Sequence, residues 1–332
     1  MPCIYLIDWV SFSTKIEKDV EDVLKLIGLP DNNTLKWIAG NGRYGYRESL
    51  SYNGITIYSS GVSDAMGIMV DMSGTGCRAF EERSSKDFQD IFKLSLQKGY
   101  NFTRLDIALD DKDELLPLER IYKDTENGNY TGQFKTYMNI GGTLGQTVQH
   151  GRKGSETMVR IYDKAAQLGR QSEGHWVRCE IQLRKGNAHG AATKLALGEH
   201  NISELYGNIV KTKLRYLSKP KKSKDTNKRR WKTAPYWQKL IETAERIKLY
   251  ERVGEEYNLS NLDRAISGYI GAISAYIDIF GSDHLDYVAT EKVETWGRNP
   301  KYDKLVEQYK KLDIEDKFQP VYTEVEVDLP FK

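Results

Sequence analysis

One stretch of the chain reads Arg104-Leu105-Asp106-Ile107-Ala108-Leu109-Asp110, and its polar and apolar residues alternate. Because successive side chains of a β-strand point to opposite faces, this pattern predicts a strand with Ile107 and its leucine neighbours facing a core. The other face then carries Arg104, Asp106 and Asp110. Taken alone, such a polar face is more often simply solvated. Two carboxylates on it become candidate ligands when a second strand shows the same pattern.

That second strand is Val177-Arg178-Cys179-Glu180-Ile181-Gln182-Leu183-Arg184. Its polar side holds Arg178 and Glu180, so pairing it with the first strand in one sheet brings Asp106, Asp110 and Glu180 together. Three oxygen ligands without a nearby thiolate or a pair of imidazoles favour Mg²⁺ or Mn²⁺ over Zn²⁺. We expect Arg104 and Arg178 to neutralise these carboxylates or to bind phosphate.

Between these strands lies a third, Met158-Val159-Arg160-Ile161-Tyr162-Asp163-Lys164. Alternation places Arg160, Tyr162 and Lys164 on one face, where two cations are expected to favour the phenolate and attract phosphate. The chain holds 21 tyrosines, so any one of them is by composition more often a packed or surface ring. Upstream, Arg152 and Lys153 belong to a basic glycine-rich turn, residues 151–155, that is suited to backbone phosphate.

The five histidines form neither a His-hydrophobic-His pair nor an HExxH motif. His150 and His175 flank the tyrosine strand and are candidate auxiliary metal ligands. A histidine that is simply hydrogen-bonded is the commoner case.

The rest of the first two hundred residues predicts strands and single helices. Two hairpins are expected, one around Asn53-Gly54 and one around Gly141-Gly142, with helical spacing over residues 16–27 and a helix from the turn at 73–76 to about residue 99. Short connections of this kind predict an α+β fold whose central sheet is largely antiparallel, with flanking helices. From about residue 188 the pattern becomes helical. We therefore expect a catalytic domain over residues 1–200 and a mostly helical C-terminal region over 201–332, for DNA recognition or oligomerisation.

Composition excludes several classes of protein. Of 332 residues, 39% are hydrophobic and 29% charged, which is typical of a globular protein, and the net charge of +2 indicates no class of partner. Three distant cysteines exclude a disulfide framework. Neither a signal peptide nor an apolar span of membrane length is found, so a cytoplasmic protein without a membrane partner is expected.

Residues 211–232 concentrate positive charge, with eleven lysines and arginines against one aspartate. Four aromatic residues are interleaved or follow directly: Tyr216, Trp231, Tyr236 and Trp237. Cations and stacking rings together favour binding to phosphate backbones or single strands. The candidates for this contact are Lys221, Lys222, Arg229, Arg230 and Trp231. A flexible charged linker is the alternative.

Five motifs occur in the order of a known family: Ile7-Asp8-Trp9-Val10-Ser11-Phe12, Met72-Ser73-Gly74-Thr75-Gly76-Cys77-Arg78, the strand from Arg104 to Asp110, Val159-Arg160-Ile161-Tyr162-Asp163-Lys164, and Arg178-Cys179-Glu180-Ile181. Over roughly residues 4–240 the chain resembles the trans-acting replication initiation factors. These are rolling-circle initiators of Gram-positive plasmids, with relatives among phage initiators and relaxases of integrative elements. The C-terminal hundred residues show no such resemblance.

The resemblance implies a fold similar to the His-hydrophobic-His nickases and an enzyme that nicks one DNA strand at an origin. It implies Tyr162 as the nucleophile, leaving a 5′-phosphotyrosyl link and a free 3′-hydroxyl, with Arg160 and Lys164 assisting. Asp106 and Glu180 are the leading Mg²⁺ or Mn²⁺ ligands, and Asp110 is a further candidate. The implied partners are single-stranded or cruciform origin DNA, a host helicase and polymerase, and a second copy of the chain.

Two rival functions remain open from the sequence. One is a metal-dependent nuclease in which water attacks and Tyr162 is structural. The other is an origin-binding protein without catalysis. A tyrosine recombinase fits less well, since it gives the two acidic strands no role.

Overall fold

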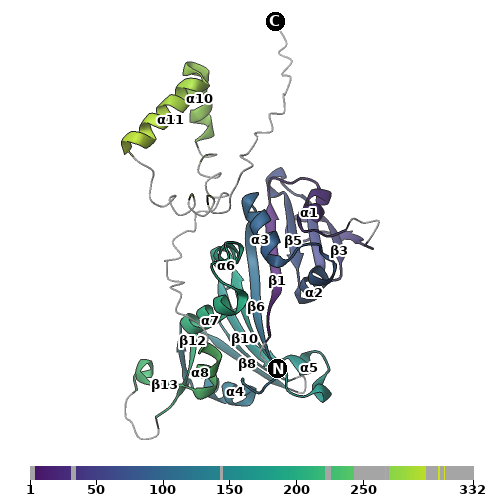
Figure 1. Ribbon diagram of the computed structural model, residues 1–332, viewed down its shortest axis with the longest axis vertical. Helices are drawn as coiled ribbons and strands as arrows, with labels where there is room; N and C mark the ends of the chain where they lie inside the picture. The colour runs from purple at the N-terminus through teal and green to yellow at the C-terminus, as the bar shows by residue number, and fades with distance from the viewer. Residues whose placement is uncertain are drawn as a thin grey trace. The chain divides into compact units, whose positions relative to one another are not determined.

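The computed structural model describes residues 4–30, 35–142, 145–220, 226–242, 266, 269–296, 306 and 310 (Figure 1). The chain divides into two compact units, Met1–Ala265 and Ile266–Lys332. Lys221 and Lys222 lie outside the described residues. No helix among the described residues combines the length and the apolar character needed to cross a bilayer.

The first unit is built on one sheet of ten strands in the order β2-β3-β4-β5-β1-β6-β11-β10-β9-β8, with antiparallel neighbours throughout. These strands are β1 (Ile4–Thr14), β2 (Ile38–Asn41), β3 (Tyr46–Tyr52), β4 (Ile55–Gly61), β5 (Ile68–Met72), β6 (Asn101–Asp111), β8 (Tyr137–Gly142), β9 (Gly145–His150), β10 (Thr157–Asp163) and β11 (Val177–Arg184). The expected α+β fold with an antiparallel sheet is confirmed. The three strands that carry the polar pattern, β6, β11 and β10, are direct neighbours near its centre.

Helices of the first unit pack against this sheet, against the small sheet described below or against one another (Figure 1). They are α1 (Val20–Leu26), α2 (Gly74–Arg83), α3 (Phe88–Gln97), α4 (Leu118–Glu126), α5 (Lys164–Gln167), α6 (Gly186–Ala196), α7 (Ile202–Lys213) and α8 (Pro235–Ile241), with short 3₁₀ turns at η1 (Asp64–Met66), η2 (Gln171–Glu173) and η3 (Lys228–Arg230). Helix α6 packs on β6 and β11, and α2 and α7 contact β1. The apolar residues of β6 and β11, such as Ile107 and Ile181, are fully buried.

The hairpin expected at Asn53-Gly54 is present between β3 and β4. Both residues have positive φ, +41° and +83°, the combination that a tight two-residue turn between twisted strands requires. The helix expected from the 73–76 turn to residue 99 is instead two helices, α2 and α3. Asp87 ends the connection between them, since its side chain accepts from Asp90 N and begins α3 with a capping box.

Residues beyond 200 also belong to the first unit. A small sheet joins β7 (Tyr130–Gly132), β12 (Leu214–Ser218) and β13 (Lys232–Thr233). Tyr206 of α7 donates to Cys179 O (3.1 Å), and Trp237 of α8 donates to Leu214 O (3.0 Å). The boundary expected at residue 200 therefore lies inside a compact unit.

In the second unit the described helices are α10 (Ile270–Phe280) and α11 (Ser282–Trp296), which contact each other. Helix α10 buries none of its residues, although most of them are apolar. Ile270, Ile279 and Phe280 are more than half exposed.

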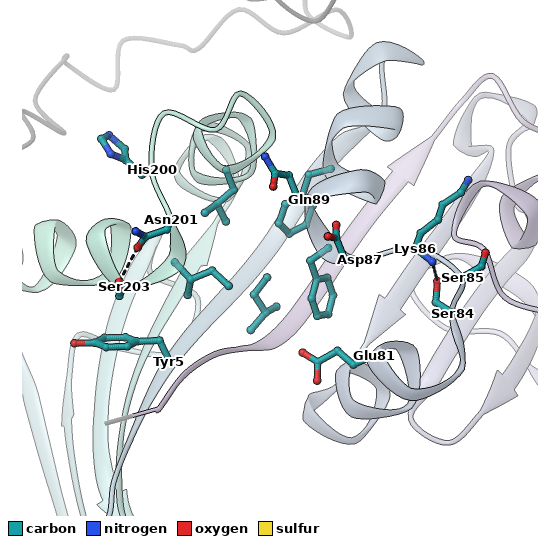
Figure 2. A pocket seen from close by; sticks show the side chains of 15 residues that line it. Tyr5, Glu81, Ser84, Ser85, Lys86, Asp87, Gln89, His200, Asn201 and Ser203 are labelled. Atoms are coloured by element: carbon teal, nitrogen blue, oxygen red, sulfur yellow. Dashed lines mark hydrogen bonds between the residues drawn. The ribbon is translucent and has the colours of Figure 1, made fainter. Parts of the chain in front are cut away.

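The helix-covered side of the sheet carries a groove of about 740 Å³ between the α2–α3 segment and the α6–α7 segment (Figure 2). Tyr5 and Ile7 of β1 line it. They lie opposite Leu109 and Ile107 of β6, which alternate with Asp106 and Asp110. The groove is therefore on the sheet face that does not carry the polar residues of β6.

Candidate active site

Strand register gathers the predicted polar residues on the other face of the sheet. Tyr162 of β10 lies opposite Arg178 of β11, and Arg178 lies opposite Asp110 of β6. One step along, Arg160 lies opposite Glu180, and Glu180 opposite Ala108. Three segments that are distant in the sequence thus meet in two adjacent rows, because each has the same period of two and pairs in antiparallel register.

Arg178 is the most enclosed cation of this face. Its Nε and Nη2 donate to the two oxygens of Asp110 (2.6 and 2.7 Å), and its Nη1 donates to Asp8 Oδ1 (2.6 Å). Arg178 and Asp110 are both buried. A bidentate pair of this kind combines two charge-assisted hydrogen bonds and fixes the relative orientation of the two side chains.

Asp8 is a site residue that the sequence reasoning did not single out. It occupies a β-bulge, since the register of β1 on β6 shifts between Ile7 and Trp9. The bulge lets Asp8 reach Arg178. Arg78 of α2 donates to Ile7 O (2.7 Å) beside the bulge, and a Cβ on Gly74 would lie 2.8 Å from Asp8 Oδ1. The available signal was that Asp8, Gly74 and Arg78 all belong to the first two motifs of the resemblance.

Tyr162 is buried, with 6% of its surface exposed, and its hydroxyl donates to Glu180 Oε2 (3.3 Å). Burial, and then the negative charge of Glu180, raise the pKa of Tyr162 above its usual value. The expectation that neighbouring cations favour the phenolate is therefore wrong in this arrangement, because desolvation and Glu180 outweigh Arg178 and Arg160.

Arg160 and Lys164 both approach the Tyr162 ring. The guanidinium carbon of Arg160 lies 5.6 Å and Lys164 Nζ 5.9 Å from the ring centre, and Arg160 Nη2 donates to Glu180 Oε1 (2.6 Å). Lys164 does not continue the strand but begins α5, and its Nζ donates to Gln167 Oε1 (2.8 Å). Burial lowers the pKa of Lys164.

Asp106 lies beside this cluster and is 1% exposed. Arg104 donates to it through Nε (3.0 Å to Oδ1) and Nη2 (2.5 Å to Oδ2), and the Arg104 guanidinium also stacks 3.8 Å from the Trp9 ring centre. Gln182 donates to the same carboxylate (3.3 Å). Burial raises the pKa of Asp106 to about 7, with Arg104 acting against the shift and Glu180 adding to it.

Of the three carboxylates predicted to bind metal, Asp106 and Glu180 lie close together and Asp110 lies apart. Asp106 and Glu180 are diagonal neighbours on paired strands, and such neighbours typically lie about 7–8 Å apart, with their Cβ atoms somewhat closer. Asp106 and Asp110 are four residues apart on one strand, which corresponds to about 13 Å at the usual rise. Both oxygens of Asp110 accept from Arg178. Within the described residues, no three His, Cys, Asp or Glu side chains come close enough to hold a metal ion.

The histidines considered as auxiliary ligands lie elsewhere. His150 is fully buried and its Nε2 is 2.8 Å from Tyr216 Oη, while His175 Nε2 is 3.1 Å from Asp111 Oδ2. Neither contacts the pair of Asp106 and Glu180.

The predicted DNA contacts outside the site are partly exposed and partly not. Arg152, Lys153, Arg229 and Arg230 are exposed on short turns, and Trp231 is half-buried. Arg104 and Arg178 instead bind carboxylates, as described above. The interleaved rings Tyr216 and Trp237 are fully buried in the core, so the prediction that they stack on nucleic acid is wrong.

Two protein-family models match the chain. The model of the replication initiation factor family matches residues 100–290, and that of the rolling circle replication initiation protein N-terminal domain matches residues 5–95. The family match thus extends to residue 290, beyond the limit near 240 that the motifs indicated, and includes helix α10.

Two individual proteins are similar over most of the chain. "Putative DNA relaxase NicK" of Bacillus subtilis (strain 168) is 26% identical over 275 residues, which cover 77% of this chain and 76% of that protein. The structure of a rolling circle replication initiator protein from Geobacillus stearothermophilus superposes with a TM-score of 0.66 at 28% identity, covering 73% of this chain and 96% of that one. With the motifs in order, the shared fold and a family match over more than half its length, the chain belongs to the replication initiation factor family of rolling-circle initiators and relaxases.

Proposed function

We propose that this protein nicks one strand of DNA at a replication origin and remains attached to the cut end through Tyr162. The observation that carries the proposal is the hydrogen bond from the Tyr162 hydroxyl to Glu180, with Arg160 and Lys164 against the same ring. This arrangement combines a nucleophile, an oriented proton acceptor and cations for a phosphodiester.

The chemistry follows from these contacts. As the Tyr162 oxygen attacks phosphorus, its proton passes to the Glu180 carboxylate, and the bond from phosphorus to the 3′-oxygen breaks. The departing 3′-oxygen takes up a proton from water and becomes a free 3′-hydroxyl, Glu180 returns its proton to water, and the 5′-phosphate stays on the tyrosine. Arg160 and Lys164 stabilise the added negative charge of the transition state. Because a phosphodiester is conserved, the reverse reaction can rejoin the strand without ATP.

Burial of Tyr162 suits this scheme. The raised pKa keeps the phenol protonated at neutral pH, so attack depends on the proton acceptor that Glu180 provides. An unoccupied enzyme therefore has a weak nucleophile.

A divalent ion fits the pair formed by Asp106 and Glu180 better than a three-carboxylate site. The two carboxylates are buried diagonal neighbours, and burial, with a smaller contribution from Glu180, raises the pKa of Asp106 although Arg104 acts against the shift. Asp106 and Glu180 would hold Mg²⁺ or Mn²⁺, and the ion would act as a Lewis acid on the phosphate. Asp110, in this proposal, positions Arg178.

The test uses a pool of single-stranded oligonucleotides with a random central region, incubated with the full chain and Mn²⁺. Wild type is expected to form a complex that survives denaturing electrophoresis, and Tyr162→Phe is expected to form none. Tyr122→Phe serves as the matched control, since this half-buried tyrosine lies in α4 with its ring beside Gly141 of β8.

The same assay separates the rival functions. Cutting by Tyr162→Phe without attached protein would favour a nuclease that uses water. An origin-binding protein would be favoured by a different result. Wild type would then bind DNA without cutting it, and Asp106→Ala and Glu180→Ala would bind DNA as wild type does. We propose further that the DNA partner is a melted or cruciform origin, that a host helicase and polymerase act on the nicked product, and that the chain works as a dimer.

A further inference from the structure

A small pocket of about 260 Å³ opens beside the Tyr162 ring. Its lining comes from β9, β10 and α5: Gln146, Thr147, Arg160, Tyr162, Asp163, Ala166 and Gln167. Thr147 lies directly opposite Tyr162 in the β9–β10 register, so the two side chains share one face of the sheet.

Several of the polar groups that line this pocket can donate hydrogen bonds, among them the Thr147 hydroxyl. Arg160 Nε is buried and has no hydrogen-bond partner within the part of the chain that the structure describes. Gln167 Oε1 accepts from Lys164, so the group that Gln167 presents to a ligand is its Nε2 amide. The acidic member, Asp163, accepts from Ala166 N (2.8 Å) at the start of α5. A ligand that fills this pocket is expected to bring hydrogen-bond acceptors.

Position indicates which part of the DNA would enter. In-line attack places the phosphorus about 3–3.5 Å from the tyrosine oxygen, so the scissile phosphate lies at the hydroxyl of Tyr162. A hollow that begins beside the ring is then next to the phosphate, where the sugar and base of a flanking nucleotide lie. Single-stranded bases are commonly splayed out and read along their edges by protein side chains.

We propose that this pocket binds the base of a nucleotide adjacent to the scissile phosphate and selects guanine or thymine, which carry a carbonyl oxygen at O6 or O4, over adenine and cytosine, which carry an amino group at that position. Guanine O6 and thymine O4 accept hydrogen bonds where adenine N6 and cytosine N4 donate them. Donors from Arg160 and Gln167 can satisfy the first kind of edge and leave the second unpaired. The inference rests on the proposed function, since it concerns the substrate of the same site.

The experiment sequences both products of the random-pool reaction, the strand attached to protein and the released strand with its 3′-hydroxyl. Wild type is expected to show guanine or thymine at one position flanking the cut. Gln167→Ala and Thr147→Val are expected to reduce this preference about tenfold, the effect of losing a specific base contact. Gln171→Ala is the matched control, since Gln171 is exposed in the next turn and does not line the pocket.

Measuring base preference distinguishes a lost contact to the base from a general disturbance of the active site. Removing the Gln167 amide also frees Lys164, which would slow all sequences equally and leave the preference unchanged. A wild-type product with no preference at either flanking position, or a preference that both variants retain, would overturn the inference while leaving the nicking proposal intact. A wild type that forms no attached product would instead overturn the proposed function, and the inference with it.

Discussion

Arg178 organises the polar face at the scale of single residues. It is buried, and its donors are shared between Asp110 and Asp8, which come from different strands. A buried cation needs such partners, because leaving it unpaired removes the compensation for its lost hydration. Tyr162 lies opposite Arg178 on β10, and Glu180 lies two residues along β11 on the same face of the sheet.

The two candidate roles of Asp110 predict different results for Asp110→Ala. If Asp110 holds Arg178, the free energy of unfolding in urea falls by about 3 kcal/mol, the usual cost of removing one partner of a buried pair. The affinity for Mn²⁺, measured by calorimetry, stays unchanged, whereas Asp106→Ala loses it. Retained stability together with lost Mn²⁺ binding would make Asp110 a metal ligand instead.

The buried His189 is expected to make the free energy of unfolding depend on pH. Burial lowers the pKa of His189 to about 4, whereas the unfolded chain titrates near 6.5. Below pH 6.5, His189 therefore binds a proton in the unfolded state but stays neutral in the folded state. The free energy of unfolding falls as the pH decreases toward 4. At pH 5 this one residue costs about 2 kcal/mol relative to pH 7.

The measurement is urea unfolding at both pH values for wild type and His189→Gln. The glutamine keeps an acceptor for Phe102 N, which donates to His189 Nδ1 (3.4 Å) in the wild type. The difference between pH 7 and pH 5 is expected to shrink by about 2 kcal/mol in the variant. An unchanged difference would mean that His189 does not titrate in this way.

Some of these residues could be predicted from sequence and some could not. Asp106, Glu180, Arg160 and Tyr162 stand out because alternation on a strand assigns each to a face before any neighbour is known. The protonation of Tyr162 could not be predicted, since it depends on burial and on Glu180 across the sheet. Asp8 could not be predicted from alternation, because a bulge interrupts the period of β1.

Helices and strands match the sequence-based predictions most closely where the residues of a turn, or the alternation along a strand, allow only one backbone conformation. The β3–β4 hairpin forms where Asn53-Gly54 allows positive φ, and β6, β10 and β11 form where polar and apolar residues alternate. The helix expected up to residue 99 divides because Asp87 can cap a new helix, a competing signal within a continuous apolar pattern. The order of the strands in the sheet could not be predicted, because it depends on pairing between segments that are distant in the sequence, which no local pattern determines.

The η3 turn carries Arg229 and Arg230, two of the residues predicted to contact the phosphate backbone of DNA. Replacing Arg229 and Arg230 by alanine is expected to flatten the dependence of DNA affinity on salt, because each lost phosphate contact removes about 0.9 from the slope on duplex. Titration with a fluorescent duplex at several NaCl concentrations measures it. Arg83→Ala, an exposed cation of α2, is the control. An unchanged slope in the double variant would return this segment to the role of a charged linker.

At the scale of the whole molecule, the chain comprises two units with different surfaces. The first buries a core of apolar residues between the sheet and its helices, while α10 of the second buries none of its residues and exposes Ile277 and Phe280 among others. We propose that the first unit carries out the nicking reaction and that the second joins two copies of the chain. Exposed apolar helices are commonly covered by a partner.

Ile277→Asp tests this division. Light scattering after size exclusion is expected to show a dimer for wild type and a dissociation constant raised at least about tenfold for the variant, given the value of burying one isoleucine. Ile38→Asp is the matched control, because Ile38 is an exposed isoleucine on edge strand β2 of the first unit. A monomeric wild type, or equal dimerisation of both variants, would contradict the assignment.

The covalent bond to Tyr162 can be measured directly. The attached complex from the oligonucleotide reaction is digested with nuclease and then with trypsin, which cuts after Arg160 and Lys164 and releases the peptide Ile161-Tyr162-Asp163-Lys164. Mass spectrometry is expected to find this peptide carrying a nucleotide on Tyr162. A nucleotide on a different tyrosine, or cut DNA with no protein attached at its 5′ end, would contradict it.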